Sequence, residues 1–140
     1  MKLNKDDLYW TNKKHTTYAV LVSPGYGCGW STWNDEFKKL AFDKRIVEYV
    51  VEHKKDKKQW DSDWSPIFGP GMCKGENDFR KFLDSIGYNS DMIFCDGMRN
   101  IEVRKVDVHA IWHIKVYDGH EELQIVNTDE DEWKICGGEP

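Results

Sequence analysis

Three glycines stand at alternate positions, Gly25, Gly27 and Gly29, between a short apolar segment and a plausible helix start. Because glycine adopts backbone conformations that other residues resist, alternate glycines let successive amide groups point into one concavity and bind an anion. Ser31 follows where a helix N-terminus would add further amide donors. The segment predicts a phosphate-binding loop whose amides face an open recess.

Aromatic residues flank these glycines. Tyr26, Trp30 and Trp33 are spaced so that their rings could stack on a flat base. Arg99 follows a further glycine, and a guanidinium makes a two-pronged contact with phosphate that lysine cannot match. Together these residues predict a site for a small nucleotide-like molecule.

A purely structural interpretation stands beside this one. The glycines could only let the chain turn sharply while Trp30 and Trp33 fill the core, and Arg99 could form a surface ion pair. The loop also lacks the Lys-Ser/Thr ending of a P-loop and the Gly-x-x-Gly spacing of a dinucleotide fold. Both interpretations stay open at the level of sequence.

Catalytic and metal chemistry is poorly supported. Asp61 with Asp63, or Asp118 with Glu121, could act as a carboxylate pair, but neither pair has a neighbouring His or metal motif. Cys28 could act as a nucleophile if the loop amides stabilised its thiolate. His109 and His113 fall about 13 Å apart on a strand, too far for one metal ion. We expect no catalytic residue, no metal and no cofactor, and keep a small hydrolase as the second alternative function.

The elements that would position the site follow from hydrophobic periodicity. Residues 17–22 predict a buried strand, and Asp43 is placed to cap a helix that ends near Lys54. A second helix is predicted over 76–86, with Gly87 just past its end, after a long loop over 56–74. Further strands are predicted over 92–94, 101–103, 110–117 and 122–126.

The last two of these strands should form a hairpin, because Asp118-Gly119 tolerates the positive backbone angles of a tight turn. The predicted fold class is α+β: a mainly antiparallel sheet of about four to six strands packed against two helices. We expect residues 1–140 to be a single domain, with 1–16 and 128–140 peripheral.

Composition narrows the function classes. The chain has 140 residues and a formal net charge of -5, which argues against general binding of duplex nucleic acid. Its four cysteines are widely spaced and its apolar runs are too short to cross a bilayer, so we expect a cytoplasmic protein without a membrane partner. A homo-oligomer, by default a dimer, is expected because symmetric oligomers are common.

An acidic run over 129–132, followed by Trp133, suggests a different partner. Such a surface could imitate nucleic acid and block a host protein, and exposed tryptophans could serve the same purpose. A protein-binding inhibitor is therefore the first alternative to nucleotide binding.

Three motifs in this order resemble those of a family of short phage and prophage proteins. The resemblance covers most of residues 18–125. It rests on the Ser-Pro-Gly-x-Gly-x-Gly-Trp-Ser-x-Trp loop at 23–33, the Phe42-Asp43 helix start, and the Tyr-Asp-Gly-x-Glu hairpin at 117–121. The Gly-x-Arg segment at 97–99 departs from the pattern, since Met98 stands where the family has an aromatic residue.

The resemblance implies a phage context and no catalytic residue. Small phage proteins of this size commonly neutralise host defences, so it implies an anti-defence role in the host cytoplasm. Combined with the loop chemistry, the leading hypothesis is a sponge that sequesters a nucleotide-like immune signal without turnover.

Overall fold

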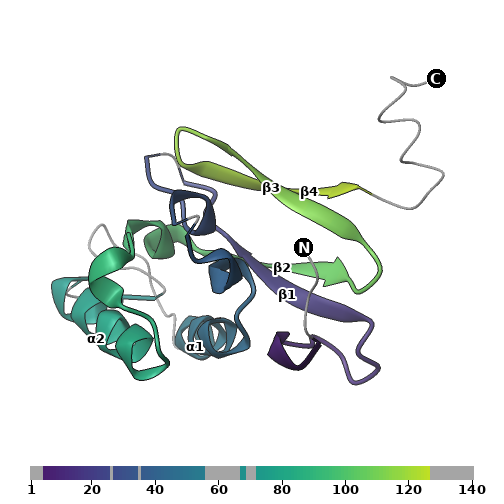
Figure 1. Cartoon of the computed structure of the whole chain (residues 1–140), viewed down its shortest axis with the longest axis horizontal. Coiled ribbons are helices and arrows are strands. Elements are labelled where there is room, and N and C mark those ends of the chain that lie inside the picture. The colour runs from purple at the N-terminus through teal and green to yellow at the C-terminus, as the bar shows by residue number, and fades with distance from the viewer. Residues whose placement is uncertain (1–4, 26, 35, 56–66, 69–71, 127–140) are drawn as a thin grey trace.

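The computed structural model describes residues 5–25, 27–34, 36–55, 67–68 and 72–126, and these form a small α+β domain as predicted (Figure 1). The part of the chain so described contains two α-helices, four strands and five short 3-10 helices. In chain order they are η1 (Lys5–Asp7), β1 (Thr17–Val22), η2 (Ser31–Trp33), η3 (Lys38–Ala41), α1 (Lys44–Lys55), α2 (Met72–Ser85), η4 (Ser90–Met92), η5 (Asp96–Asn100), β2 (Glu102–Asp107), β3 (Ile111–Tyr117) and β4 (His120–Val126).

The four strands form two separate antiparallel sheets rather than one. β1 pairs with β2, from Thr17 opposite Asp107 to Val22 opposite Glu102, and β3 pairs with β4. A tight turn in which Ala110 N donates to Asp107 O separates β2 from β3. The chain therefore leaves the first sheet and starts a second layer within three residues.

β1 lies between two hydrophobic clusters because its alternate side chains point to opposite faces. Ala19 and Leu21 pack into the cluster beneath the helices, whereas Tyr18 and Val20 pack into the cluster beneath the β3–β4 hairpin. In Figure 1 the β1–β2 sheet accordingly lies between α1 and that hairpin. Because both faces of β1 are buried, its sequence is almost continuously apolar.

Asp43 caps α1, as predicted. Its Oδ1 accepts a hydrogen bond from Arg45 N at 3.0 Å, and its carboxylate also takes bonds from the Arg45 guanidinium and the Tyr88 hydroxyl. Burial alone raises the pKa of Asp43, but these hydrogen bonds and the Arg45 charge outweigh it and lower the pKa below its ordinary value. The cap thus joins α1 to the segment that follows α2.

Gly87 ends α2 in the left-handed conformation that the sequence predicts, with φ at 103°. Gly87 N donates to Asp84 O and Tyr88 N donates to Leu83 O, which is the Schellman arrangement. The helix begins at Met72, four residues before the predicted start.

The hairpin turn is also confirmed, because Asp118 and Gly119 have φ of 49° and 81°. The predicted strand over 92–94 is wrong. Met92 ends a 3-10 helix instead, and the backbone N–H of Phe94 bonds to the side chain of Asn34 rather than to a strand. None of the described helices has the length and apolar character needed to span a membrane.

Replacing Asp43 with Asn should destabilise the protein at neutral pH by about 1–3 kcal/mol, because hydrogen bonds to a charged group are lost. A carboxyl group whose folded-state pKa is lowered stabilises above its unfolded-state pKa and loses that contribution as pH falls through the folded-state value. The difference in unfolding free energy between wild type and Asp43→Asn should therefore shrink below about pH 4.

Urea unfolding at pH 7 and at pH 3 measures this difference. Asp78→Asn is the control, because Asp78 is exposed on α2. A difference that stays constant between the two pH values would contradict the assignment.

Candidate functional site

The glycine loop is wrapped around the buried carboxylate of Glu121. Oε1 of Glu121 accepts from Ser23 N at 2.9 Å, and Oε2 accepts from Trp30 N at 2.7 Å and from Thr32 N at 3.1 Å. The Thr32 hydroxyl donates to the same oxygen at 2.5 Å. The loop backbone thus binds an anion, but the donors are Ser23, Trp30 and Thr32 and not the predicted glycine amides, and the anion is a side chain of the protein itself.

Glycines allow the close approach that this arrangement needs. A Cβ at Gly97 would lie 2.2 Å from Gly29 O, and one at Gly119 would lie 2.4 Å from Cys28 N. Gly27 has φ of 99° and donates its N–H to Asp118 O at 2.6 Å. The hairpin turn and η5 are thereby pressed directly against the loop backbone.

Trp30 is a core residue. Its side chain is fully buried, its indole N–H donates to Leu40 O at 2.8 Å, and its ring packs against Phe79. Trp33, three residues later on η2, is 40% exposed. The two tryptophans that the sequence places in one site therefore have different surroundings.

The other predicted site residues are spread around the loop. Ser31 begins η2, Gly25 lies against the side chain of Asn100, and Arg99 is exposed on η5. Tyr26 lies outside the described residues, and so does the predicted carboxylate pair of Asp61 and Asp63.

The Cys28 thiol is not activated. Burial and the carboxylate of Asp96 raise its pKa, and the charge of Arg99 opposes that rise only in part. A raised pKa keeps the thiol protonated at neutral pH, whereas a nucleophilic cysteine needs a lowered one. Among the described residues, no group of His, Cys, Asp or Glu side chains gathers as metal ligands do.

A cleft beside the loop is rimmed by exposed apolar side chains. The rings of Trp33 and Phe94 meet edge to face with centroids 5.4 Å apart, and Met92 is 59% exposed next to them. Together with the carboxylates of Asp91 and Asp96 these residues line a cleft of about 480 Å³. We call these five residues the Trp33–Phe94 surface.

Polar side chains hold this surface in place. Asn34 accepts from Phe94 N at 2.7 Å and donates to Trp30 O and Phe94 O at 2.8 and 2.9 Å. The Arg80 guanidinium donates to Ser90 O at 2.6 Å and pairs with Glu76 at 3.0 Å. The cleft is therefore rigidly framed, and its Arg80 charge is already used within the protein.

No family model, curated protein or solved structure matches the chain.

Sequence reasoning considered Glu121 only as a possible carboxylate pair with Asp118, and it missed the role of Glu121 as the partner of the glycine loop. A usable indication was present, because Glu121 shares a strand face with Leu123, and a charge on an apolar face needs internal partners. Asn34 and Phe94 gave no comparable indication, since they lie 60 residues apart and meet only through the tertiary fold.

Replacing Glu121 with Gln should destabilise the protein by about 2–4 kcal/mol, because one carboxylate oxygen becomes an amide that faces backbone donors. Glu122→Gln is the matched control: the same change on the next residue, whose side chain is exposed. Urea unfolding should show a lower midpoint for Glu121→Gln alone. Equal midpoints for the two variants would mean that Glu121 does not hold the loop.

Proposed function

We propose that this chain is a non-enzymatic binding protein that holds a partner protein on the Trp33–Phe94 surface. The observation that carries the proposal is the pairing of two exposed aromatic rings, 40% and 46% accessible, beside two carboxylates. Aromatic residues and methionine are enriched in the centres of protein interfaces, and a few of them supply most of the binding energy. This function is the protein-binding alternative of the sequence analysis, in the form that acts through an exposed tryptophan, here Trp33.

The chemistry of the surface selects a basic partner. An arginine or lysine side chain would contact the faces of Trp33 and Phe94 while pairing with Asp91 or Asp96. Among the described residues that line the cleft Arg80 is the sole cation, and Ser90 O and Glu76 hold its guanidinium. The cleft thus favours positive charge in its partner.

The family resemblance supplies a biological context for the proposal. In a phage protein such a surface would bind a host defence protein and block it by occupying the site of a natural partner. The protein would then act in the host cytoplasm without chemical turnover.

Binding of a nucleotide-like molecule stays a second candidate, favoured by the exposed Trp33 ring at a cleft of about 480 Å³, within the usual range for small-molecule sites. The base would stack on Trp33. The phosphates would have to point away from Asp91 and Asp96, and Arg99, on the same 3-10 helix as Asp96, would meet them.

Replacing Trp33 with Ala should weaken partner binding by about 30-fold, the effect of losing about 2 kcal/mol at a central interface residue. Ile125→Ala is the control, because Ile125 is 39% exposed on β4, away from the cleft. Immobilised wild type and both variants are incubated with bacterial host lysate, and each captured protein is quantified by mass spectrometry. The captured partner's affinity for each variant is then measured by calorimetry.

We expect one partner, held equally by wild type and Ile125→Ala and released by added salt, because Asp91 and Asp96 contribute charge. A partner that Trp33→Ala binds as tightly as wild type overturns the proposed surface. No captured protein, together with heat released on titrating cyclic nucleotides or ADP-ribose derivatives, would replace the proposal with the second candidate.

A further inference from the structure

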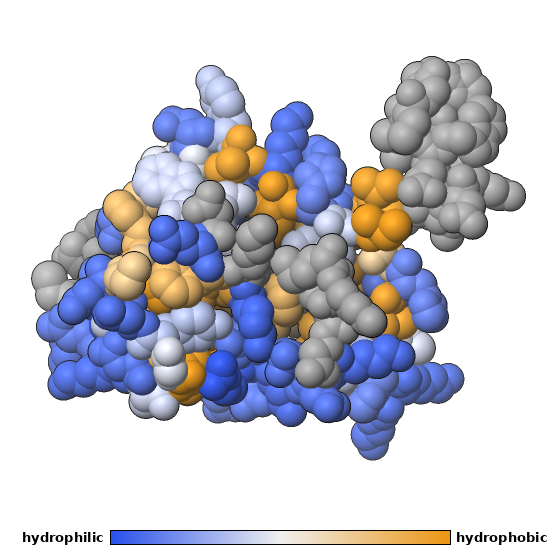
Figure 2. Space-filling view, viewed as in Figure 1, coloured by the Kyte–Doolittle hydropathy of each residue, from blue (hydrophilic) through white to orange (hydrophobic). Residues whose placement is uncertain are grey.

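β3 is an exposed strand edge of unusual composition. Ile111, Val116 and Tyr117 are 58%, 41% and 74% exposed along a single strand. Edge strands are normally protected by charge, as β2 is by Arg104 and Lys105, whereas β3 carries a single lysine, Lys115, among its apolar residues. Figure 2 shows apolar surface over the β3–β4 hairpin between charged residues. An apolar edge of this kind marks a place where another strand pairs.

The hairpin geometry identifies which backbone groups lie on that edge. Tyr117 and His120 close the two-residue turn as a hydrogen-bonded pair, and bonded and non-bonded pairs alternate along the ladder. The N–H and C=O groups of Trp112, Ile114 and Val116 therefore point away from β4. Glu121, opposite Val116, follows the same rule on the far edge of β4, where its N–H donates to Ser23 O.

In the part of the chain that the structure describes, β3 pairs with β4 alone. The backbone N–H and C=O groups on its other edge can therefore pair with a strand of a partner.

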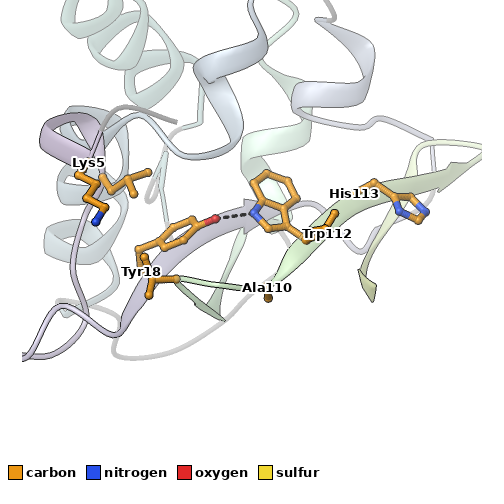
Figure 3. Close-up of a pocket in the computed structure, with 8 residues that line it drawn as sticks. Lys5, Tyr18, Ala110, Trp112 and His113 are labelled. Atoms are coloured by element: carbon orange, nitrogen blue, oxygen red, sulfur yellow. Dashed lines mark hydrogen bonds between the residues drawn. The ribbon is translucent and has the colours of Figure 1, made fainter. Parts of the chain in front are cut away.

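A pocket of about 650 Å³ runs along this edge. The consecutive residues 110–113 of the chain all line it, although neighbouring side chains point to opposite faces of a strand. Leu8, Tyr18 and Lys5 also line the pocket. The Trp112 indole donates to the Tyr18 hydroxyl at 2.6 Å. In Figure 3 Lys5 and His113 stand at opposite ends of the row of labelled side chains.

We propose that the occupant of this edge is β3 of a second copy of the chain, paired antiparallel about a twofold axis at Ile114. The apolar residues of the strand are self-complementary in that register, and the remaining pair is His113 opposite Lys115 of the partner subunit. Ile111 meets Tyr117 of the partner subunit, and Trp112 meets Val116 of the partner subunit. Each apolar pair joins a β-branched residue to an aromatic one, which is a favourable cross-strand combination.

The same register explains the pocket. Val116 of the partner subunit, directly opposite Trp112 and therefore on the same face of the sheet, adds an apolar side chain on the side of Leu8 and Tyr18. Asp118 of the partner subunit falls opposite Ala110 and so approaches Lys5 with opposite charge. Two marginal two-stranded sheets thereby become one four-stranded sheet, which is more stable in water.

Sedimentation velocity over about 1–200 µM tests the proposal. We expect wild type to shift from 16.5 kDa to twice that mass as concentration rises. Ile111→Lys should raise the dissociation constant at least tenfold, because it buries an unpaired charge. Ile125→Lys is the matched control, since Ile125 is 39% exposed on β4, which is not the strand paired in the proposed dimer, and it should dimerise like wild type.

Two further variants keep the test decisive. Tyr117→Ala removes a side chain that is 74% exposed and so contributes little to the stability of the monomer, and it should weaken the dimer even if Ile111→Lys folds poorly. Lys5→Glu should weaken the dimer by repelling Asp118 of the partner subunit, and adding Asp118→Asn should restore part of the affinity. A wild type that stays monomeric, or a dimer that Tyr117→Ala and folded Ile111→Lys leave unchanged, overturns the proposal.

Discussion

The contact between the Glu121 carboxylate and the glycine loop is the interaction on which the other features depend. A buried carboxylate is costly unless donors surround it, and buried amides are costly unless they find an acceptor. Ser23 N, Trp30 N and Thr32 N satisfy the carboxylate, and the carboxylate satisfies them. The carboxylate and the amides therefore each remove the free-energy cost of burying the other without a hydrogen-bond partner.

That contact joins elements that are distant in sequence. Glu121 belongs to the β3–β4 hairpin, whereas the loop leads from β1 into η2, so the second sheet is fastened to the first at this point. Because η2 starts directly after the loop, the same contact sets the position of Trp33. Asn34 then carries the connection onward to Phe94, and the two rings meet at the surface.

The two proposed interfaces lie on different parts of this frame and differ in chemistry. The Trp33–Phe94 surface combines aromatic rings with Asp91 and Asp96, which suits a basic side chain. The β3 edge offers backbone donors and acceptors beside apolar side chains, which suits another strand. A dimer formed through β3 leaves the described residues of the Trp33–Phe94 surface out of its pairing, so the two kinds of binding are compatible.

Local sequence determined the elements whose causes are local. The buried strand at 17–22, the Asp43 cap, the Gly87 helix end and the Asp118-Gly119 turn each depend on a few neighbouring residues and backbone angles, and all were predictable. Contacts between residues far apart in the sequence decided three other features. The strands form two sheets and not one, residues 92–94 do not form a strand, and Glu121 is the partner of the glycine loop. The glycine spacing predicted that the amides of Gly25, Gly27 and Gly29 would bind an external anion. Only the tertiary structure decided that the neighbouring amides of Ser23, Trp30 and Thr32 bind Glu121, because nothing local brings residue 121 to residues 23–32.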